Sequence, residues 1–304
     1  NYSKIEVGYG PEDMLWDSIS TENDRILVSC GSRRDEHKQE INGIYSINPK
    51  TEEVLKLSQS GHPEDLEFHS HGFDIEEVAG KVYLFVINHE DEIGRQSILK
   101  YEVKANELIL DSMIQNKLII SPNDIYVLGD GSFFITNDAG KRGSKTELML
   151  MQKKGSVVYF PVQGNAIIID DRLGMPNGLY FKEPYLFVST SMQGKLFRYK
   201  KLNNSFTQKT IIAKKLPGAD NLNPYQKGLL VPCHPRYLAF IRHAGKAEKP
   251  SPSVVYYVSF DGKTKTAVFS NDGNKISCGS TAIIKDDYIY VSQIFENFVL
   301  KAIH

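Results

Sequence analysis

The chain has only three cysteines among its 304 residues, namely Cys30, Cys233 and Cys278. Three thiols cannot all pair with one another, and none has a second Cys or a His at the short spacing of a structural zinc site. We therefore expect three small buried side chains, and neither a disulfide framework nor a zinc centre. Cysteine usage leaves the cellular compartment open.

An excess of charge of one sign is also missing, because 36 basic residues stand against 37 acidic ones and the formal net charge is -1. No long block of like charge occurs, so we expect no nucleic-acid partner. The chain also lacks the roughly eighteen consecutive apolar residues of a membrane span, and it shows no signal-peptide pattern. Position 1 is Asn and not Met, which fits a removed leader or a trimmed chain. The location stays open, with an extracytoplasmic one, secreted or periplasmic, slightly favoured.

Helical periodicity is scarce, and short apolar runs separated by Gly, Pro and Asn fill the chain instead. Runs about eight to twelve residues apart are typical of an all-β sandwich, barrel or propeller. Some runs are continuously apolar, as in residues 81–87, which indicates a strand that is covered on both faces. The expected strands are residues 25–29, 43–47, 82–87, 98–103, 147–151, 157–160, 166–169, 185–189, 195–199, 228–231, 237–241, 253–259, 266–269, 281–284, 288–292 and 298–302.

Polar doublets recur ahead of the apolar runs, and this repeat selects the propeller. Asn123-Asp124 is one example, because it precedes a predicted hairpin whose two apolar runs flank the turn residues 129–131. Comparable segments follow one another at roughly fifty-residue intervals, the length of one propeller blade. They are residues 10–13, 69–74, 123–124, 175–178, 219–221 and 278–281. We predict an all-β fold, a six-bladed β-propeller that forms a single domain over residues 1–304.

The polar doublets would meet at one opening if the first strand of every blade begins at the mouth of a central channel. They bring together seven side chains with oxygen donors and no thiolate, a ligand set that suits calcium better than zinc. These are Glu12, Asp13, Asn123, Asp124, Asn177, Asp220 and Asn221. Two ionised carboxylates would repel one another there, and a divalent cation would relieve that repulsion. The alternative is that the doublets make ordinary turns.

Two histidines, His71 and His89, stand at the two ends of a predicted hairpin, so their rings could meet. A paired arrangement would let one ring deprotonate water while the other fixes its tautomer. The alternative is two separate hydrogen-bonded histidines. The sequence has no Gly-x-Ser-x-Gly elbow, phosphate-binding loop or dinucleotide fingerprint. The polar residues 32–42 form either a solvated loop or a flap over the channel mouth.

Eight short segments, taken in order, resemble motifs of the paraoxonase and arylesterase family, whose members are calcium-dependent lactonases with six-bladed propellers. The segments are Gly10-Pro11-Glu12-Asp13, Phe68-His69-Ser70-His71-Gly72-Phe73, Val86-Ile87-Asn88-His89, Ser121-Pro122-Asn123-Asp124-Ile125, Pro176-Asn177-Gly178, Ala219-Asp220-Asn221, Pro232-Cys233-His234-Pro235 and Gly279-Ser280-Thr281. Each segment is short and unspecific, but eight in register are specific.

The resemblance implies two calcium ions and a set of site residues. A catalytic ion would be held by Glu12, Asn123, Asn177, Asp220 and Asn221, and a buried structural ion by Asp13, Asp124 and the backbone carbonyl of Phe73. His71 and His89 would form the catalytic dyad, and His234 and Phe73 would lie in the substrate pocket. Neighbouring side chains of a strand point to opposite sides, so we expect Asn123 and Asp124 to serve different ions, the second one enclosed by protein.

The chain departs from the family at three points. It has no cysteine near either end for the disulfide that closes the mammalian propellers, so strand pairing must close the ring. The apolar N-terminal helix of those members is missing, so lipid association is not implied. Glu90 follows His89 where the family commonly has Pro, which adds a negative charge beside the dyad.

The expected function is calcium-dependent hydrolysis of lactones and aryl esters, with a small-molecule substrate as the partner. We expect an apolar pocket wall, because Trp16, Phe73 and Tyr225 lie in segments near the proposed mouth. One alternative is a sugar-lactone hydrolase of the gluconolactonase type. Another is a non-catalytic propeller that serves as a binding platform, since a fold does not determine a function.

Overall fold

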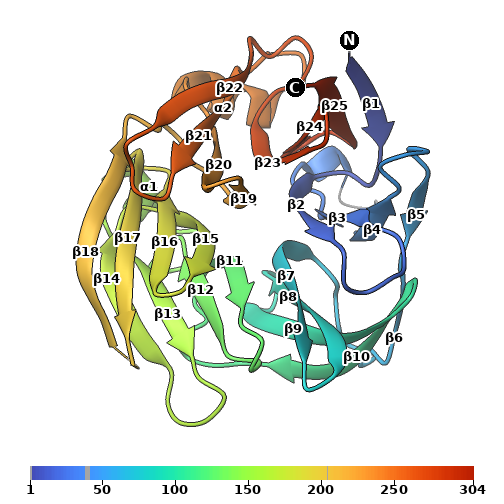
Figure 1. Cartoon of the computed structure of the whole chain (residues 1–304), viewed down its shortest axis with the longest axis vertical. Coiled ribbons are helices and arrows are strands. Elements are labelled where there is room, and N and C mark those ends of the chain that lie inside the picture. The colour runs from blue at the N-terminus through green and yellow to red at the C-terminus, as the bar shows by residue number, and fades with distance from the viewer. Residues whose placement is uncertain (1, 38–41, 204) are drawn as a thin grey trace.

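The computed structural model describes residues 2–37, 42–203 and 205–304. In this part of the chain, six β-sheets stand around a central axis like the blades of a propeller (Figure 1). The predicted all-β, six-bladed propeller is confirmed.

Every blade has four antiparallel strands, which follow one another from the axis outward. Blade one has β2 (Pro11–Asp17), β3 (Arg25–Cys30), β4 (Gly43–Ile47) and β5 (Val54–Lys56), and blade two has β7 (Ser70–Val78), β8 (Lys81–Glu90), β9 (Arg95–Lys104) and β10 (Glu107–Ile114), with the short β6 (Ser58–Ser60) parallel to β10. Blade three has β11 (Pro122–Val127), β12 (Phe133–Asn137), β13 (Gly155–Phe160) and β14 (Ile167–Leu173), and blade four has β15 (Pro176–Lys182), β16 (Tyr185–Thr190), β17 (Lys195–Leu202) and β18 (Ser205–Lys214). Blade five has β19 (Asn223–Tyr225), β20 (Gly228–Cys233), β21 (Ser253–Ser259) and β22 (Lys265–Asn271), and blade six has β23 (Gly279–Lys285), β24 (Tyr288–Gln293), β25 (Phe298–Ile303) and β1 (Tyr2–Glu6).

The ring is closed by the two ends of the chain. Strand β1 pairs antiparallel with β25, from Tyr2 opposite Ala302 to Glu6 opposite Phe298, so the N-terminal strand completes the last blade (Figure 1). Ring closure by strand pairing, expected from the lack of terminal cysteines, is confirmed.

The hydrophobic core lies between the blades. Along β8, Leu84 and Val86 pack toward blade one, whereas Phe85 and Ile87 pack toward blade three. This arrangement explains why the run 81–87 is continuously apolar, because both faces of the strand are covered. The described residues form six such clusters of buried apolar side chains, one at each boundary between neighbouring blades. The three cysteines are buried and form no disulfide among the described residues, as expected.

Two of the predicted strands are helices. Residues 147–151 overlap helix α1 (Lys145–Met149), and residues 237–241 overlap helix α2 (Tyr237–Gly245). Short apolar runs do not distinguish a strand from a helix by periodicity, and here the apolar side chains are exposed, with Met149 at 81% and Leu238 at 68%. Ser144 caps α1 by accepting a hydrogen bond from the backbone N–H of Glu147.

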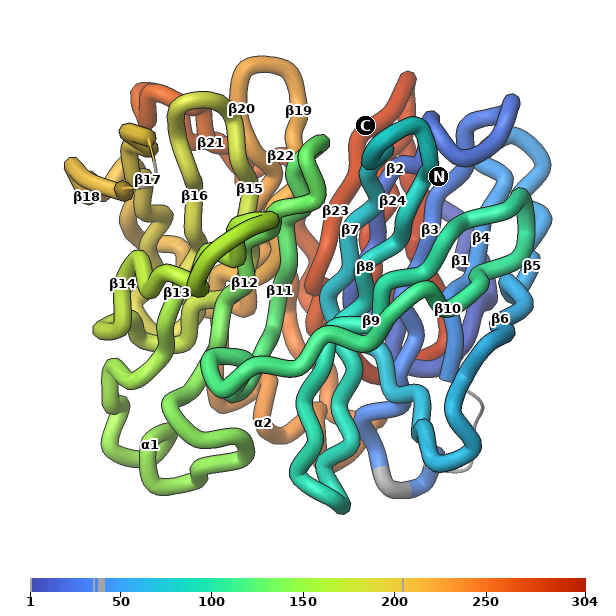
Figure 2. Tube along the Cα trace, turned by 90° about the horizontal axis from the view of Figure 1, so that it is seen from below, coloured from blue at the N-terminus to red at the C-terminus, as the bar shows by residue number. Residues whose placement is uncertain are grey.

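The two helices lie on one face of the ring. Both follow the second strand of a blade, and antiparallel pairing brings that end of the blade back to where the innermost strand begins. Figure 2 shows α1, α2 and the turn between β8 and β9 together at the lower face, which we call the dyad face. None of the helices in the described part of the chain is long and apolar enough to cross a membrane.

Candidate active site on the dyad face

One extra residue interrupts strand pairing at the start of every innermost strand. In blade three Pro122 pairs with Asn137, and the next pair is Ile125 with Ile135, so β11 advances by three residues while β12 advances by two. Blades one, two, four and six also have one extra residue on the innermost strand. In blade five the pairing goes from Ala219 with Cys233 to Asn223 with Leu230, so the inner segment advances by four residues while β20 advances by three. A β-bulge turns side chains away from the regular alternation. The polar doublets lie in these bulges.

Five side chains from the bulges each have a buried oxygen that accepts no hydrogen bond from any described residue. These atoms are Glu12 Oε2, Asn123 Oδ1, Asn177 Oδ1, Asp220 Oδ1 and Asn221 Oδ1. A buried polar atom without a partner costs about 1–3 kcal/mol, so five of them in one channel favour a bound ligand. They are the same five residues that the sequence resemblance implies for the catalytic calcium.

This donor set fits a calcium ion, because hard cations prefer carboxylate and amide oxygens. No group of three or more His, Cys, Asp and Glu side chains in the described ranges forms a metal site by itself. The set therefore depends on its three Asn amides as much as on its two carboxylates. Asn221 Nδ2 lies 3.4 Å from Glu12 Oε1, so the donors of blades one and five are in contact.

The two carboxylates differ in their electrostatic surroundings. Burial raises the pKa of Glu12, but the charges of the adjacent His71 and of Arg33 outweigh burial and leave that pKa below its usual value. Burial also raises the pKa of Asp220, and the nearby Glu12 charge adds to this, so the pKa remains raised despite the hydrogen bond from His234. A cation would stabilise the ionised form of Asp220 most.

His71 and His89 form a hydrogen-bonded pair beside these oxygens. His71 Nδ1 lies 2.9 Å from His89 Nε2, and the rings meet edge to face at 77°. The other ring nitrogen of His71, Nε2, lies 3.4 Å from both Glu12 Oε2 and Asn123 Nδ2. Burial, with the charges of Arg142 and His71, holds the pKa of His89 well below its usual value, so His89 is neutral at neutral pH. The structure thus pairs the two rings instead of separating them.

Glu90 does not disturb this pair. Its carboxylate accepts two hydrogen bonds from Arg95, at 2.6 Å each, and one from the backbone N–H of Glu67 at 3.1 Å. Successive residues of a strand point to opposite faces, so the negative charge after His89 lies away from the imidazoles.

Aromatic side chains pack beside His234 on the dyad face. His234 Nε2 lies 2.8 Å from Asp220 Oδ2, and the ring is 4.8 Å from that of Phe240 on α2. Phe240 in turn lies 6.0 Å from Phe295, between β24 and β25. Sequence reasoning missed Phe240 and Phe295, because the first lies in a segment interpreted as a strand and the second lies outside every polar doublet.

The aromatic residues expected at this mouth lie elsewhere. Trp16 follows Glu12 by four residues on β2, and at about 3.3 Å per residue it stands some 13 Å further along the channel. Tyr225 packs against Tyr257 and His304, with ring centroids 6.1 and 5.8 Å away. The side chain of Phe73 is only 3% exposed and packs in the core between blades one and two, and the residue lines a pocket at the other end of the channel.

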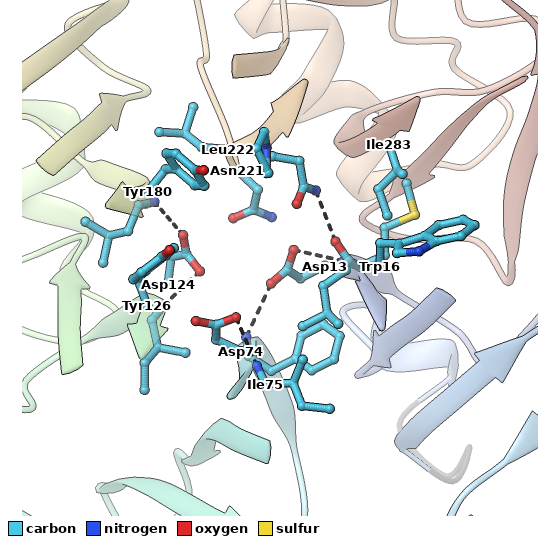
Figure 3. Close-up of a pocket in the computed structure, with 17 residues that line it drawn as sticks. Asp13, Trp16, Asp74, Ile75, Asp124, Tyr126, Tyr180, Asn221, Leu222 and Ile283 are labelled. Atoms are coloured by element: carbon cyan, nitrogen blue, oxygen red, sulfur yellow. Dashed lines mark hydrogen bonds between the residues drawn. The ribbon is translucent and has the colours of Figure 1, made fainter. Parts of the chain in front are cut away.

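A second pocket of about 300 Å³ opens at the other end of the channel (Figure 3). It is lined by Asp13 and Asp124, the side chains that the resemblance implies for the structural calcium, and by Trp16, Tyr126 and Tyr180. These two residues thus line an open pocket, whereas we expected an ion enclosed by protein. Asn123 lies at the dyad end and Asp124 at the pocket end, so the expected separation of the doublet is observed.

Sequence reasoning missed a third carboxylate in this pocket, that of Asp74. Figure 3 shows it pointing into the same space as Asp13 and Asp124. Burial raises the pKa of Asp74 to about 7, although its oxygens accept hydrogen bonds from the backbone of Ile75 and Val127. Burial also raises the pKa of both Asp13 and Asp124 well above the usual value, and for Asp13 the charge of Asp124 adds to this effect. The three carboxylates share this pocket but form no metal site by themselves among the described residues, so a cation there would also need other oxygens, such as the backbone carbonyl of Phe73.

The predicted loop or flap over residues 32–42 is described only in part, because residues 38–41 lie outside the described residues. The described part includes a 3-10 helix, η1 (Asp35–His37). Arg34 donates to the backbone carbonyl of His243 on α2 at 2.7 Å and to Glu296 Oε1 at 2.9 Å. Arg33 donates to the carbonyls of Gly31 and Ser70. These bonds attach the start of the loop to the dyad face.

Several known proteins are similar to this chain in sequence. The sequence matches the arylesterase family over residues 38–300. Serum paraoxonase/arylesterase 2 of Canis lupus familiaris is 24% identical over 302 residues, which cover 96% of this chain and 84% of that protein. Serum paraoxonase/arylesterase 1 of Mus musculus is 26% identical, with 83% and 74% covered. Serum paraoxonase/lactonase 3 of Homo sapiens is 24% identical, with 83% and 73% covered.

Solved structures with the same fold include a luciferin-regenerating enzyme, with a TM-score of 0.62 at 11% identity, which covers 100% of this chain and 95% of that one. A gluconolactonase from Xanthomonas campestris has a TM-score of 0.56 at 13% identity, with 98% and 99% covered. These likenesses concern the fold alone. The family match spans most of the chain, and we conclude that this protein belongs to the arylesterase family.

Proposed function

We propose that this protein is a calcium-dependent hydrolase of lactones and aryl esters, and that residues 1–304 act as one propeller domain. The observation that carries the proposal is a histidine pair in contact with a ring of five buried oxygens that lack partners among the described residues. Support also comes from relatives that are named arylesterases and a lactonase. A binding platform would need neither the ring nor the pair.

Glu12, Asn123, Asn177, Asp220 and Asn221 would hold the catalytic ion through the five oxygens. When bound, calcium would supply Lewis-acid polarisation of the ester carbonyl and stabilise negative charge on its oxygen. We assign a second, structural ion to Asp13, Asp124 and the carbonyl of Phe73. The remaining chemistry belongs to the side chains of the protein.

We assign the role of general base to His71. Its Nε2 faces the ring of oxygens, so a water molecule at the mouth can transfer a proton to it while the water oxygen attacks the carbonyl carbon. His89 holds the opposite side of the His71 ring through the 2.9 Å hydrogen bond. His234, together with Phe240 and Phe295, would form one wall of the pocket and exclude water from the acyl part of the substrate.

A panel of substrates tests this proposal. We expect alkyl-substituted lactones and aryl esters to be hydrolysed faster than polar sugar lactones, because the wall near His234 is aromatic. Each rate should fall to background when calcium is removed with a chelator and return when calcium is added in excess. Faster hydrolysis of a sugar lactone would favour a gluconolactonase-type enzyme. An absence of turnover with every substrate, at saturating calcium, would favour a binding platform.

A further inference from the structure

The histidine pair is continued by three side chains that the proposed dyad does not use. Gln96 on β9 stands directly opposite His89 on β8, and its Oε1 is hydrogen-bonded to His89 Nδ1. Gln96 Nε2 donates to Asp91 Oδ1 at 2.9 Å. Asp91 is held by Arg142, whose Nε and Nη2 donate to the two carboxylate oxygens at 3.2 and 3.3 Å. A hydrogen-bonded chain therefore runs from the exposed Asp91 to the buried dyad.

The carboxylate at the outer end determines the direction of the first hydrogen bonds. Burial raises the pKa of Asp91, but hydrogen bonding and the charge of Arg142 outweigh it, so Asp91 is ionised and only accepts hydrogen bonds. The NH2 group of Gln96 must therefore face Asp91, and its carbonyl oxygen must face His89. An amide oxygen accepts and does not donate, so the hydrogen of His89 lies on Nδ1.

The same reasoning assigns the ring hydrogens of both histidines. A neutral imidazole carries one N–H, so His89 Nε2 has a free lone pair and accepts the hydrogen bond of His71 Nδ1. The hydrogen of neutral His71 is then on Nδ1, and its Nε2 lone pair faces the mouth. Glu12 Oε2 lies 3.4 Å from this nitrogen and also accepts hydrogen bonds, so the assignment applies to the calcium-loaded protein, in which the cation would engage that oxygen. Asn123 agrees with this, because its Nδ2 is directed at His71 Nε2 at 3.4 Å while its Oδ1 has no partner among the described residues.

The geometry points to Gln96 as a positioning residue that sets the tautomers of His89 and His71 and leaves His71 Nε2 free to accept a proton. Without the amide oxygen of Gln96, His89 could carry its hydrogen on Nε2 and donate to His71 Nδ1. His71 would then carry its own hydrogen on Nε2, where the base must be unprotonated. The tautomer assignment stands on the hydrogen bonds, and only its effect on turnover depends on the proposed function.

Two-dimensional NMR of the calcium-loaded protein, labelled with 15N-histidine, tests the tautomers directly. Long-range proton–nitrogen spectra distinguish protonated from unprotonated ring nitrogens, and the variants His71→Gln and His89→Gln assign the two rings. In the wild type we expect Nδ1 to be protonated in both rings. In Gln96→Leu we expect a second population with the hydrogen on Nε2 of both rings. Unchanged tautomers in Gln96→Leu would overturn the inference.

Rates measured on the same variants separate this inference from the proposed function. We expect Gln96→Leu to lower kcat by on the order of tenfold or more with KM nearly unchanged, since a misplaced proton disables a general base. Gln96→Glu combined with Asp91→Asn keeps an oxygen acceptor opposite His89 and supplies an amide donor at position 91, so it should restore both the tautomers and most of the rate. The control Gln115→Leu removes an exposed glutamine of the same blade and should change neither. A tautomer shift at full kcat would support the role of Gln96 and overturn His71 as the base.

Asp91→Asn provides a second variant at an exposed position, where folding is not endangered. An asparagine can donate as well as accept, so the amide of Gln96 loses its imposed direction. We expect mixed tautomers and a kcat between those of the wild type and Gln96→Leu. Wild-type tautomers in Asp91→Asn would overturn the direction that we assign to the chain.

Discussion

Asn123 and Asp124 are neighbours in the sequence, but their side chains lie in different environments. The amide of Asn123 contacts His71 at the dyad face, whereas the carboxylate of Asp124 accepts hydrogen bonds from Ile125 and Leu179 and lines the opposite pocket. The bulge in β11 makes this possible, since the extra residue turns the chain between the two side chains. A single dipeptide can thus contribute to two ion sites with different roles.

We expect Asn123→Ala and Asp124→Ala to have different effects for this reason. Asn123→Ala should lower turnover by at least tenfold and leave the melting temperature within a few degrees of the wild type, because it removes a ligand from the site that must accept substrate. Asp124→Ala should lower the melting temperature and remove its dependence on trace calcium. Thermal melts and rate assays across a calcium titration measure both. Equal losses of stability and activity in the two variants would refute separate ions.

His71→Gln tests the base itself. We expect turnover of lactones to fall by on the order of a hundredfold or more, the usual size of a lost general base, with calcium affinity largely kept. The affinity is expected to persist because His71 is not among the five residues with unpartnered buried oxygens. Isothermal titration with calcium and steady-state kinetics provide the two numbers. A rate near that of the wild type would move the role of base to Glu12 or Asp220.

The innermost strands approach one another closely at their bulges, and glycine permits this. A Cβ atom on Gly72 of β7 would stand 2.4 Å from the carbonyl oxygen of Asn123 and 2.8 Å from the Cα of Asp124. Gly178 of β15 has the same relation to blade five, with 2.6 Å to the backbone nitrogen of Leu222. Backbone cannot move aside cheaply, so these glycines set the spacing of the ligand-bearing strands.

Gly72→Ala should therefore displace β11 and weaken both ion sites together. We expect a loss of about 1–3 kcal/mol in the free energy of unfolding, as for other overpacked positions, and weaker binding of both calcium ions. Gly245→Ala is the matched control, because a Cβ there meets nothing within 4 Å. Denaturant unfolding with and without calcium measures the change. Wild-type calcium affinity in Gly72→Ala would show that the strand spacing does not control the sites.

Charge at the channel axis affects the whole molecule, because all six blades meet there. Asp13, Asp74 and Asp124 have pKa values raised above the ordinary value of 3.8, and that of Asp74 is about 7. The folded chain without metal therefore holds protons that the unfolded chain releases. The stability contributed by these groups is present below about pH 4 and is lost as pH rises toward 7 and above. A bound cation would replace the protons and restore that stability.

The raised pKa values predict that replacing one of these carboxylates stabilises the protein when no metal is bound. In the presence of a chelator, we expect Asp124→Asn to melt above the wild type at pH 8, by roughly 5 °C, because one buried charge is gone. The difference should shrink as pH falls, because carboxyls with raised pKa values take up protons in the folded wild type. In excess calcium the order should reverse, since the wild type alone keeps the full site. Comparing the two proteins cancels the opposing titration of buried His89. A wild type that melts higher than Asp124→Asn at every pH without calcium would contradict the prediction.

The sequence by itself determined the propeller, because an apolar run covered on both faces and a polar doublet every fifty residues or so are local patterns that survive in one dimension. It also identified the seven oxygen-bearing side chains, and their family likeness separated them into two sets. The tertiary structure decided which residues meet. The bulges, the strand spacing at Gly72, the helical form of residues 237–245 and the contact of Gln96 with His89 all depend on pairing between segments. Trp16 shows the physical reason most simply, because each residue of an extended strand advances the chain along the channel, so a residue near Glu12 in sequence lies far from it in space. Phe240 shows the opposite case, because it is remote from every doublet in sequence and yet lies beside His234.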